Sequence, residues 1–92
     1  MATAPTWAAC SMRVQVLAFA RLRELLGFGA REIEVPAGSD LNALWKALAA
    51  NASQIDALRE TTRFARNGAV VDAATALRDG DEIALMPPVG GG

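Results

Sequence analysis

The chain has 92 residues, 52% of them hydrophobic, and its 9 basic and 10 acidic residues give a formal net charge of −1. This length and composition are typical of one folded domain with a single core, and the mixed charges lack the basic block that nucleic-acid binding requires. Histidine is absent from the sequence, which disfavours a self-sufficient hydrolase or a zinc enzyme. No apolar stretch approaches the roughly 20 residues that span a bilayer, so we expect no membrane association.

Residues 1–11 are expected to form a flexible leader. They carry no positive charge and no long apolar run, so they do not fit a signal peptide, and we expect a cytoplasmic protein. Cys10 lies in this leader and is the only cysteine, which excludes an internal disulfide. We interpret Cys10 as incidental.

The first half of the patterned region predicts a strand, a short helix and a second strand. Residues 13–19 alternate and then turn apolar, which is typical of a half-buried strand. Residues 20–26 have leucines at helical spacing, and Gly27 follows as a C-cap. Residues 31–35 alternate cleanly and end at Pro36, which closes a second strand.

The main helix is predicted to begin after Ser39 or Asp40, since either side chain can cap it. One apolar stripe at helical spacing is formed by Leu41, Leu44, Trp45 and Leu48. Trp45 in such a stripe is interpreted as a core residue without a functional role. Asn51 is a plausible stop, and residues 55–59 predict another turn or two of helix.

The second half predicts a hairpin and a last strand. Asn67-Gly68 lies between the expected strand segments 63–66 and 69–71, which favours a type I′ turn with positive φ at both central positions. A second tight turn around Gly80 leads into a strand over 82–86. Pro87 and Pro88 offer no backbone N–H, so the sheet should stop there.

This order of elements predicts an α+β domain in which a mixed sheet packs on one main helix, since no other element could bury the helical stripe. Asp79 and Asp81 flank Gly80, but their spacing does not match a calcium loop, and we expect a solvated turn and no metal site.

The chain ends in Gly90-Gly91-Gly92, directly after the stiff segment Pro87-Pro88-Val89. Glycine loses more conformational freedom on ordering than any other residue, so three terminal glycines do not stabilise a fold. They can, however, thread a narrow channel and present an unhindered carboxylate. The alternative is a frayed terminus, which the preceding prolines and valine make less favourable.

Two segments resemble one known family. Residues 16–27 and residues 77–92 are similar to the two ends of the MoaD-type sulfur carriers, the small subunits of molybdopterin synthase in the MoaD/ThiS family. The resemblance runs from Met12 to Gly92 and is strongest at both ends. It implies a ubiquitin-like β-grasp domain over residues 12–86 and an extended functional tail over residues 87–92.

The resemblance also implies a function for the terminal residue. A partner similar to the ubiquitin-activating enzymes would adenylate the carboxylate of Gly92 with ATP, and a sulfur donor system would convert it to a thiocarboxylate. The synthase large subunit would then use this sulfur on cyclic pyranopterin monophosphate, in molybdenum cofactor biosynthesis. The catalytic side chains are expected on that large subunit, and this chain is expected to bind no cofactor of its own.

The tail residues are expected to thread into the partner: Pro87, Pro88, Val89, Gly90 and Gly91. Residues 87–92 could reach about 20 Å if fully extended. Docking on the large subunit is expected through apolar sheet surface, with Phe19, Val70 and Met86 as the candidates that match the family pattern. The alternative is that these side chains belong to the core. At Met86 the family often has a larger aromatic residue.

Three alternatives remain. The chain could carry sulfur for another pathway, such as thiamine thiazole synthesis, cysteine synthesis or tRNA thiolation, with the same chemistry at Gly92. It could be a ubiquitin-like protein modifier whose Gly92 forms isopeptide bonds with target lysines. Since Lys46 is the only lysine, such a modifier could hardly form chains with itself. It could also be an interaction domain with an inert tail.

Overall fold

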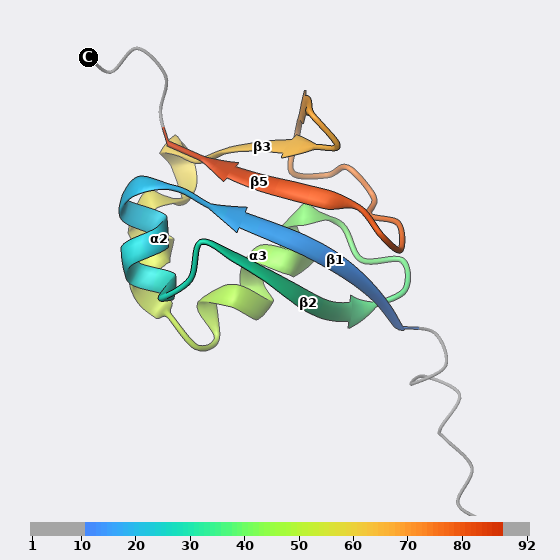
Figure 1. Ribbon diagram of the computed structural model, residues 1–92, viewed down its shortest axis with the longest axis horizontal. Helices are drawn as coiled ribbons and strands as arrows, with labels where there is room; N and C mark the ends of the chain where they lie inside the picture. The colour runs from blue at the N-terminus through green and yellow to red at the C-terminus, as the bar shows by residue number, and fades with distance from the viewer. Residues whose placement is uncertain (1–10, 88–92) are drawn as a thin grey trace, which may run out of the picture.

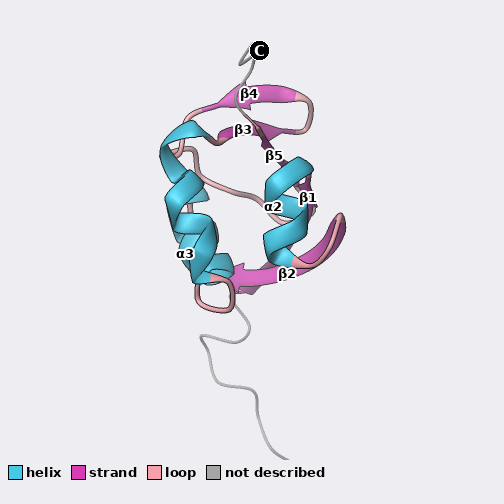
Figure 2. Cartoon of the chain, turned by 90° about the vertical axis from the view of Figure 1, so that its left-hand side faces the viewer, coloured by secondary structure: helices cyan, strands magenta, loops and turns pink. Residues whose placement is uncertain are grey.

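The computed structural model describes residues 11–87, which form a mixed five-stranded sheet with the helices packed on one face (Figures 1 and 2). The strand order is β2-β1-β5-β3-β4. Only β1 and β5 pair in parallel, at the centre of the sheet, and the other pairs are antiparallel. The elements in chain order are β1 (Ser11–Ala18), α2 (Ala20–Leu26), β2 (Ala30–Pro36), α3 (Leu41–Ala49), the 3₁₀ helix η1 (Ser53–Thr61), β3 (Arg63–Arg66), β4 (Ala69–Val71) and β5 (Glu82–Met86). The predicted α+β class is therefore confirmed.

The core lies between α3 and the sheet. The predicted stripe of α3 is buried, and it packs with the alternate side chains of β1 and β5 in one cluster. Trp45 is 4% exposed, makes an edge-to-face contact with Phe64 at 6.1 Å between ring centroids, and donates from Nε1 to Asp56. The core interpretation of Trp45 is confirmed.

Asp40 is the residue that caps α3. Its carboxylate accepts a hydrogen bond from the backbone N–H of Ala43 at 2.9 Å, whereas the Ser39 hydroxyl donates to the carbonyl of Pro36. Of the two predicted caps, Asp40 is therefore correct. The helix ends at Ala49, slightly before the predicted stop at Asn51.

The predicted short helix after α3 is a 3₁₀ helix of nine residues. Ile55 is its only buried residue, so η1 has no row of buried side chains at the spacing of an α-helix. The hydroxyl groups of Thr61 and Thr62 both donate to the carbonyl of Leu58, which competes with helical backbone bonding at this end.

The two predicted tight turns are confirmed. Asn67 has φ 51° and Gly68 has φ 90°, as a type I′ turn requires, and Gly80 has φ 87°. The Asn67 side chain donates to Asp81 and accepts from the backbone N–H of Glu82. The hairpin turn is thereby joined to the turn that precedes β5.

The borders of the sheet lie close to the predicted ones. Ser11, assigned to the leader from sequence, is the first residue of β1 and pairs with Pro36. At the other end β5 stops at Met86, directly before Pro87, as expected. No helix within residues 11–87 has the length and apolar character that crossing a membrane requires.

Candidate functional site

The face of the sheet that carries no helix is crossed by one apolar row, contributed by all five strands. The residues are consecutive register partners, in the order Ala30, Leu17, Ala84, Ala65 and Val70. Side chains alternate between the two faces of a strand, and the neighbours of these residues in β1 and β5 are buried against the helices. The row therefore lies on the opposite face, which is toward the viewer in Figure 1.

Two of the three residues predicted as partner contacts, Val70 and Phe19, are exposed. Val70 is 65% exposed and Phe19 is 46% exposed, and no other large hydrophobic residue within residues 11–87 is exposed. Met86 is half-buried. The alternative that Phe19 and Val70 belong to the core is therefore ruled out.

Phe19 and Met86 occupy equivalent positions at the end of the sheet from which the tail leaves. Ala18 and Leu85 are the last register partners of the parallel β1–β5 pair. Phe19 directly follows β1, and Met86 is the last residue of β5. Met86 also pairs with Arg63 on β3. The apolar row and these two residues together make a candidate docking surface beside the first residue of the tail.

A small cavity of about 70 Å³ lies where the tail begins. Its lining is mostly apolar and comes from α2, η1 and the residues at the strand ends: Phe19, Ala20, Arg21, Leu22, Leu58, Thr61, Thr62 and Pro87. Ala20 has φ 52°, an unfavourable value for a residue with a Cβ, and it turns the chain sharply from β1 into α2. The chain thus leaves the sheet at Pro87, which lines this apolar cavity.

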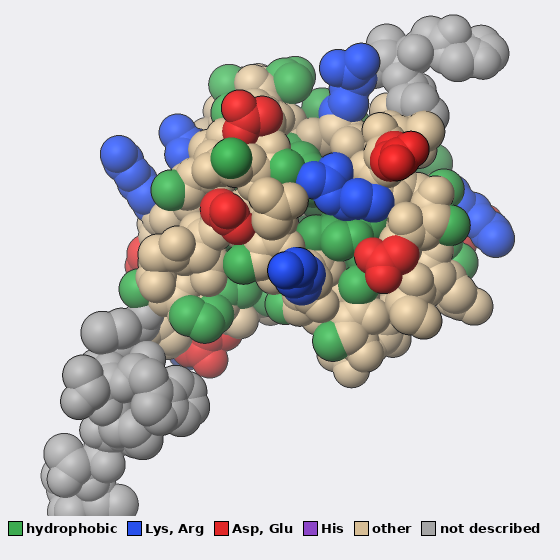
Figure 3. Space-filling view, turned by 180° about the vertical axis from the view of Figure 1, so that it is seen from behind, with side chains coloured by type: hydrophobic (Ala, Val, Ile, Leu, Met, Phe, Trp, Pro, Cys, Tyr) green, Lys and Arg blue, Asp and Glu red, His purple; other side chains and the backbone are tan. Residues whose placement is uncertain are grey.

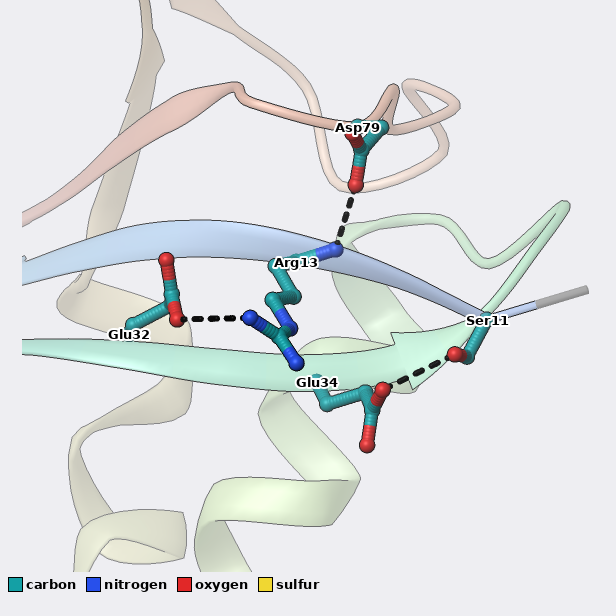
Figure 4. A network of polar contacts seen from close by, with 5 residues as sticks. All are labelled: Ser11, Arg13, Glu32, Glu34 and Asp79. Carbon is teal, nitrogen blue, oxygen red and sulfur yellow. Dashed lines mark hydrogen bonds and ion pairs between the residues drawn. The ribbon is translucent and has the colours of Figure 1, made fainter. Parts of the chain in front are cut away.

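The opposite end of the helix-free face is polar (Figure 4). Arg13 lies 3.7 Å from Glu32 in an exposed ion pair, and the Ser11 hydroxyl donates to Glu34. The backbone N–H of Arg13 donates to Asp79 at 2.8 Å, which ties the turn before β5 to β1. This polar border limits the apolar surface to the half of the sheet nearer the tail.

Asp81 differs from the solvated side chain expected from sequence. It is 6% exposed, and its carboxylate accepts hydrogen bonds from the Asn67 side chain and from the backbone N–H of Arg78. Asp79 and Asp81 therefore hold the turn together. Within residues 11–87, no group of three or more Cys, Asp or Glu side chains is arranged to hold a metal ion.

The structure brings the predicted contacts Phe19 and Met86 together near Pro87 and places Val70 at the far side of the same surface. Sequence reasoning missed Leu17, Ala30, Ala65 and Ala84, which complete the surface. The alternation of side chains within each strand shows which residues share a face. It does not show which residues of different strands lie side by side, because that register joins segments far apart in the sequence. The other predicted tail residues, Pro88, Val89, Gly90, Gly91 and Gly92, lie outside the described residues, as does Cys10.

Comparison with protein families and curated proteins agrees with the resemblance of the sequence. The model of the ThiS family matches residues 16–92. A molybdopterin synthase sulfur carrier subunit from Chlamydomonas reinhardtii is 35% identical over 83 residues, covering 88% of this chain and 100% of the relative. A protein of the same name from Homo sapiens is 34% identical, covering 87% of this chain and 94% of the relative.

Solved structures share the fold over nearly their whole length. A putative molybdopterin converting factor subunit 1 from Pyrococcus furiosus has a TM-score of 0.77 at 29% identity, over 85% of this chain and 99% of that one. SAMP1 from Haloferax volcanii has a TM-score of 0.74 at 26% identity, over 87% and 99%. A chain in the complex of molybdopterin-converting factor subunits 1 and 2 from Helicobacter pylori has a TM-score of 0.59 at 30% identity, over 88% and 100%. The fold is therefore the ubiquitin-like β-grasp.

Proposed function

The chain belongs to the ThiS family, and we propose that it is the sulfur carrier subunit of a molybdopterin synthase. Curated relatives that match most of this chain bear that name. The observation that carries the proposal is the point where the tail begins: β5 ends at Met86, and Pro87 follows it at the end of an exposed apolar sheet surface. A carrier needs this arrangement, because its body must dock while its terminus enters the partner's site.

The reactive group in this proposal is the carboxylate of Gly92. A free carboxylate is a poor acyl donor, so a partner similar to the ubiquitin-activating enzymes first joins it to AMP and releases pyrophosphate from ATP. Sulfide sulfur then displaces AMP and leaves a C-terminal thiocarboxylate. A thiocarboxylate is a far better nucleophile at neutral pH than the carboxylate it replaces. Its sulfur is then transferred to cyclic pyranopterin monophosphate.

The body is proposed to dock on the synthase large subunit through the apolar row together with Phe19 and Met86. The solved complex of Helicobacter pylori pairs a similar chain with subunit 2 of the same factor. Burial of Phe19 and Val70, the two exposed large hydrophobic residues, supplies association free energy. Pro87 and Pro88 aim the tail and reduce the entropy lost when it inserts.

In this proposal the carrier contributes the reactive atom and the large subunit contributes the catalytic side chains. The absence of histidine from the sequence agrees with that division. The residues that act on the pterin are proposed to lie on the large subunit. The protein is proposed to work in the cytoplasm, where ATP and the activating partner are available.

The proposal is tested by mass spectrometry of the full chain after incubation with its activating enzyme, ATP and sodium sulfide. Replacement of one oxygen by sulfur adds nearly the same nominal mass as oxidation of a methionine, so fragment spectra must locate the change at Gly92 and not at Met1, Met12 or Met86. A thiocarboxylate at Gly92 is expected. An unchanged Gly92 with an active enzyme would contradict the proposal.

A second candidate is a ubiquitin-like protein modifier. The similarity to SAMP1, a small archaeal modifier protein, favours this alternative. A modifier would leave Gly92 as an amide on target lysines, and such adducts survive boiling and reductant. A carrier for thiamine, cysteine or tRNA thiolation would share the thiocarboxylate, and it is distinguished by which large subunit it binds.

A further inference from the structure

The outer edge of β2 carries free backbone hydrogen-bonding groups. β2 lies at one border of the sheet, and within residues 11–87 only its inner edge is paired, with β1. It is seven residues long and most of its residues are exposed. Figure 1 shows it as the lowest strand of the sheet. Such an edge is a ready template for another strand.

The hydrogen bonds of β1 identify which residues of β2 point outward. The N–H of Ala18 donates to the carbonyl of Gly29 at 2.9 Å, so these opposite residues form a hydrogen-bonded pair. The backbone N–H groups of Arg13 and Gln15 point away from β2: they donate to Asp79 and Asp81, in the turn that precedes β5. Because hydrogen-bonded pairs alternate along an antiparallel ladder, residues 31, 33 and 35 bond to β1. The N–H and C=O groups of residues 30, 32 and 34 are therefore free at the edge.

A groove with both apolar and polar lining runs beside this edge on the helix side of the sheet. Its volume is about 150 Å³, and it lies between β2 with the residues before it and the end of α3. The lining residues are Leu26, Phe28, Arg31, Ile33, Ala47, Leu48, Asn51 and Ala52. A strand added to β2 would direct every second side chain toward this groove.

The groove is bordered by two cationic side chains. The Arg31 guanidinium lies 4.5 Å from the centre of the Phe28 ring. The Arg23 side chain lies close to Gly29: a Cβ placed on this glycine would be only 3.2 Å from Nε of Arg23. The ion pairs within residues 11–87 are Arg13–Glu32 and Arg21–Glu24, so neither Arg23 nor Arg31 has a carboxylate partner. Figure 3, which views the helix side, shows basic and acidic side chains interspersed over this face.

The two faces of the β2 edge have opposite charge. Glu32 and Glu34 are register partners of Gln15 and Arg13, so they lie on the helix-free face (Figure 4). Arg31 and Ile33 line the groove on the other face. A second copy of this chain pairing antiparallel through β2, with the pair centred on Glu32 or Ile33, would place glutamate opposite glutamate on the helix-free face, which is unfavourable. The charges therefore select a different strand as the occupant.

We propose that the β2 edge and its groove bind an extended peptide segment of another protein by strand addition. The segment carries apolar and acidic side chains on the groove side and lysine or arginine on the other side. This site does not include the tail and shares only Ala30 with the apolar row, so it is distinct from the rest of the proposed sulfur-carrier surface. It would allow the carrier to be bound while its tail is engaged elsewhere.

The probe is the acetylated and amidated peptide Thr-Val-Lys-Ile-Lys-Glu-Thr. Aligned antiparallel to residues 36–30, it places its glutamate opposite Arg31, its isoleucine opposite Ile33 and its lysines opposite Glu32 and Glu34. The control peptide Thr-Val-Glu-Ile-Glu-Lys-Thr exchanges the charges. Binding to the ¹⁵N-labelled full chain is followed by amide chemical shifts at millimolar peptide.

We expect shifts at Glu32, Glu34, Leu48 and Ala52 with the probe and much weaker binding of the control peptide. Glu32→Pro removes one outward N–H and spares the ladder with β1, so it should weaken binding about three- to tenfold relative to Glu32→Ala, which keeps that N–H. Arg31→Glu should reduce the preference for the probe over the control peptide, because it turns one of the three charge pairs of the probe into a repulsion and leaves the two pairs with Glu32 and Glu34. An unchanged preference in this variant would contradict the proposal even if the proline variant folds poorly.

Three further results would overturn the proposal. One is the absence of any shift with the probe at millimolar concentration, and another is equal binding of the two peptides. The third is self-association of the full chain in sedimentation experiments that Glu32→Pro abolishes, because the edge would then belong to a second copy.

Discussion

Ala65 and Val70 are register partners in the β3–β4 hairpin, on the helix-free face of the sheet, yet Ala65 is 7% exposed and Val70 is 65% exposed. The small alanine is covered by its neighbours, whereas the valine stands on the edge strand. The apolar row therefore ends in a projecting side chain on β4. A partner that covers the row must also cover Val70.

The first prediction concerns Val70. Val70→Asp should weaken binding to the synthase large subunit about tenfold or more, because a charge would be buried in an apolar contact. Stability should change little, since the side chain is mostly exposed. Isothermal titration calorimetry measures the affinity, and thermal unfolding measures the stability.

The matched control is Ala69→Asp. Ala69 is also exposed and adjacent in β4, but it pairs with Arg66 and lies on the other face of the strand. Its replacement should leave the affinity within about twofold of the original chain. Equal loss of affinity in both variants would mean that β4 contacts the partner by its edge and not by the helix-free face.

The second prediction concerns Phe19, which is 46% exposed and lines the cavity beside Pro87. Phe19→Ala should weaken the complex about tenfold, as expected for an aromatic residue at an interface. The free energy of unfolding should fall by about 1 kcal/mol or less. Phe28→Ala removes a half-buried ring beside β2 and serves as the control that should not affect the complex. A normal affinity for Phe19→Ala would place the docking contact elsewhere on the sheet.

The third prediction concerns the turn that precedes β5. Asp81→Ala should lower the free energy of unfolding by about 2 kcal/mol, because a buried carboxylate that accepts two hydrogen bonds is lost and their donors are left unpaired. Asp79→Ala removes one exposed hydrogen bond to the backbone of Arg13 and should cost about 1 kcal/mol or less. Urea unfolding of both variants measures the difference. If Asp79→Ala proved the more costly, the turn would depend on its link to β1 and not on the buried network.

The elements of this fold could be predicted because their signals are local. The stripe of α3, the alternation of β2 and the turn at Asn67-Gly68 are each contained in a few neighbouring residues. The 3₁₀ form of η1 was harder to predict from sequence, because the segment has a weak apolar pattern and only Ile55 is buried in it.

The docking surface was only partly predictable because it depends on register. Phe19, Val70 and Met86 were identified by their match to a family pattern, but alternation alone does not tell which face of a strand the helices cover. Leu17 and Ala84 become part of the surface only when the parallel pairing of β1 and β5 is known. That pairing joins segments far apart in the sequence, and no local motif encodes it.

The last prediction concerns the chain terminus. One alanine added after Gly92 should abolish sulfur transfer to the pterin, because the carboxylate would no longer belong to the terminal glycine and a Cβ would have to pass the channel that admits glycine. The fold should be unaffected, since β5 ends at Met86, before the tail begins. The assay combines the activating enzyme, ATP, sodium sulfide and the large subunit, and amide spectra check the fold. One residue added before Met1 is the matched control and should leave transfer unchanged. If the C-terminal extension transferred sulfur normally, the terminal carboxylate would not be the carrier group, and the alternative of an inert tail would gain support.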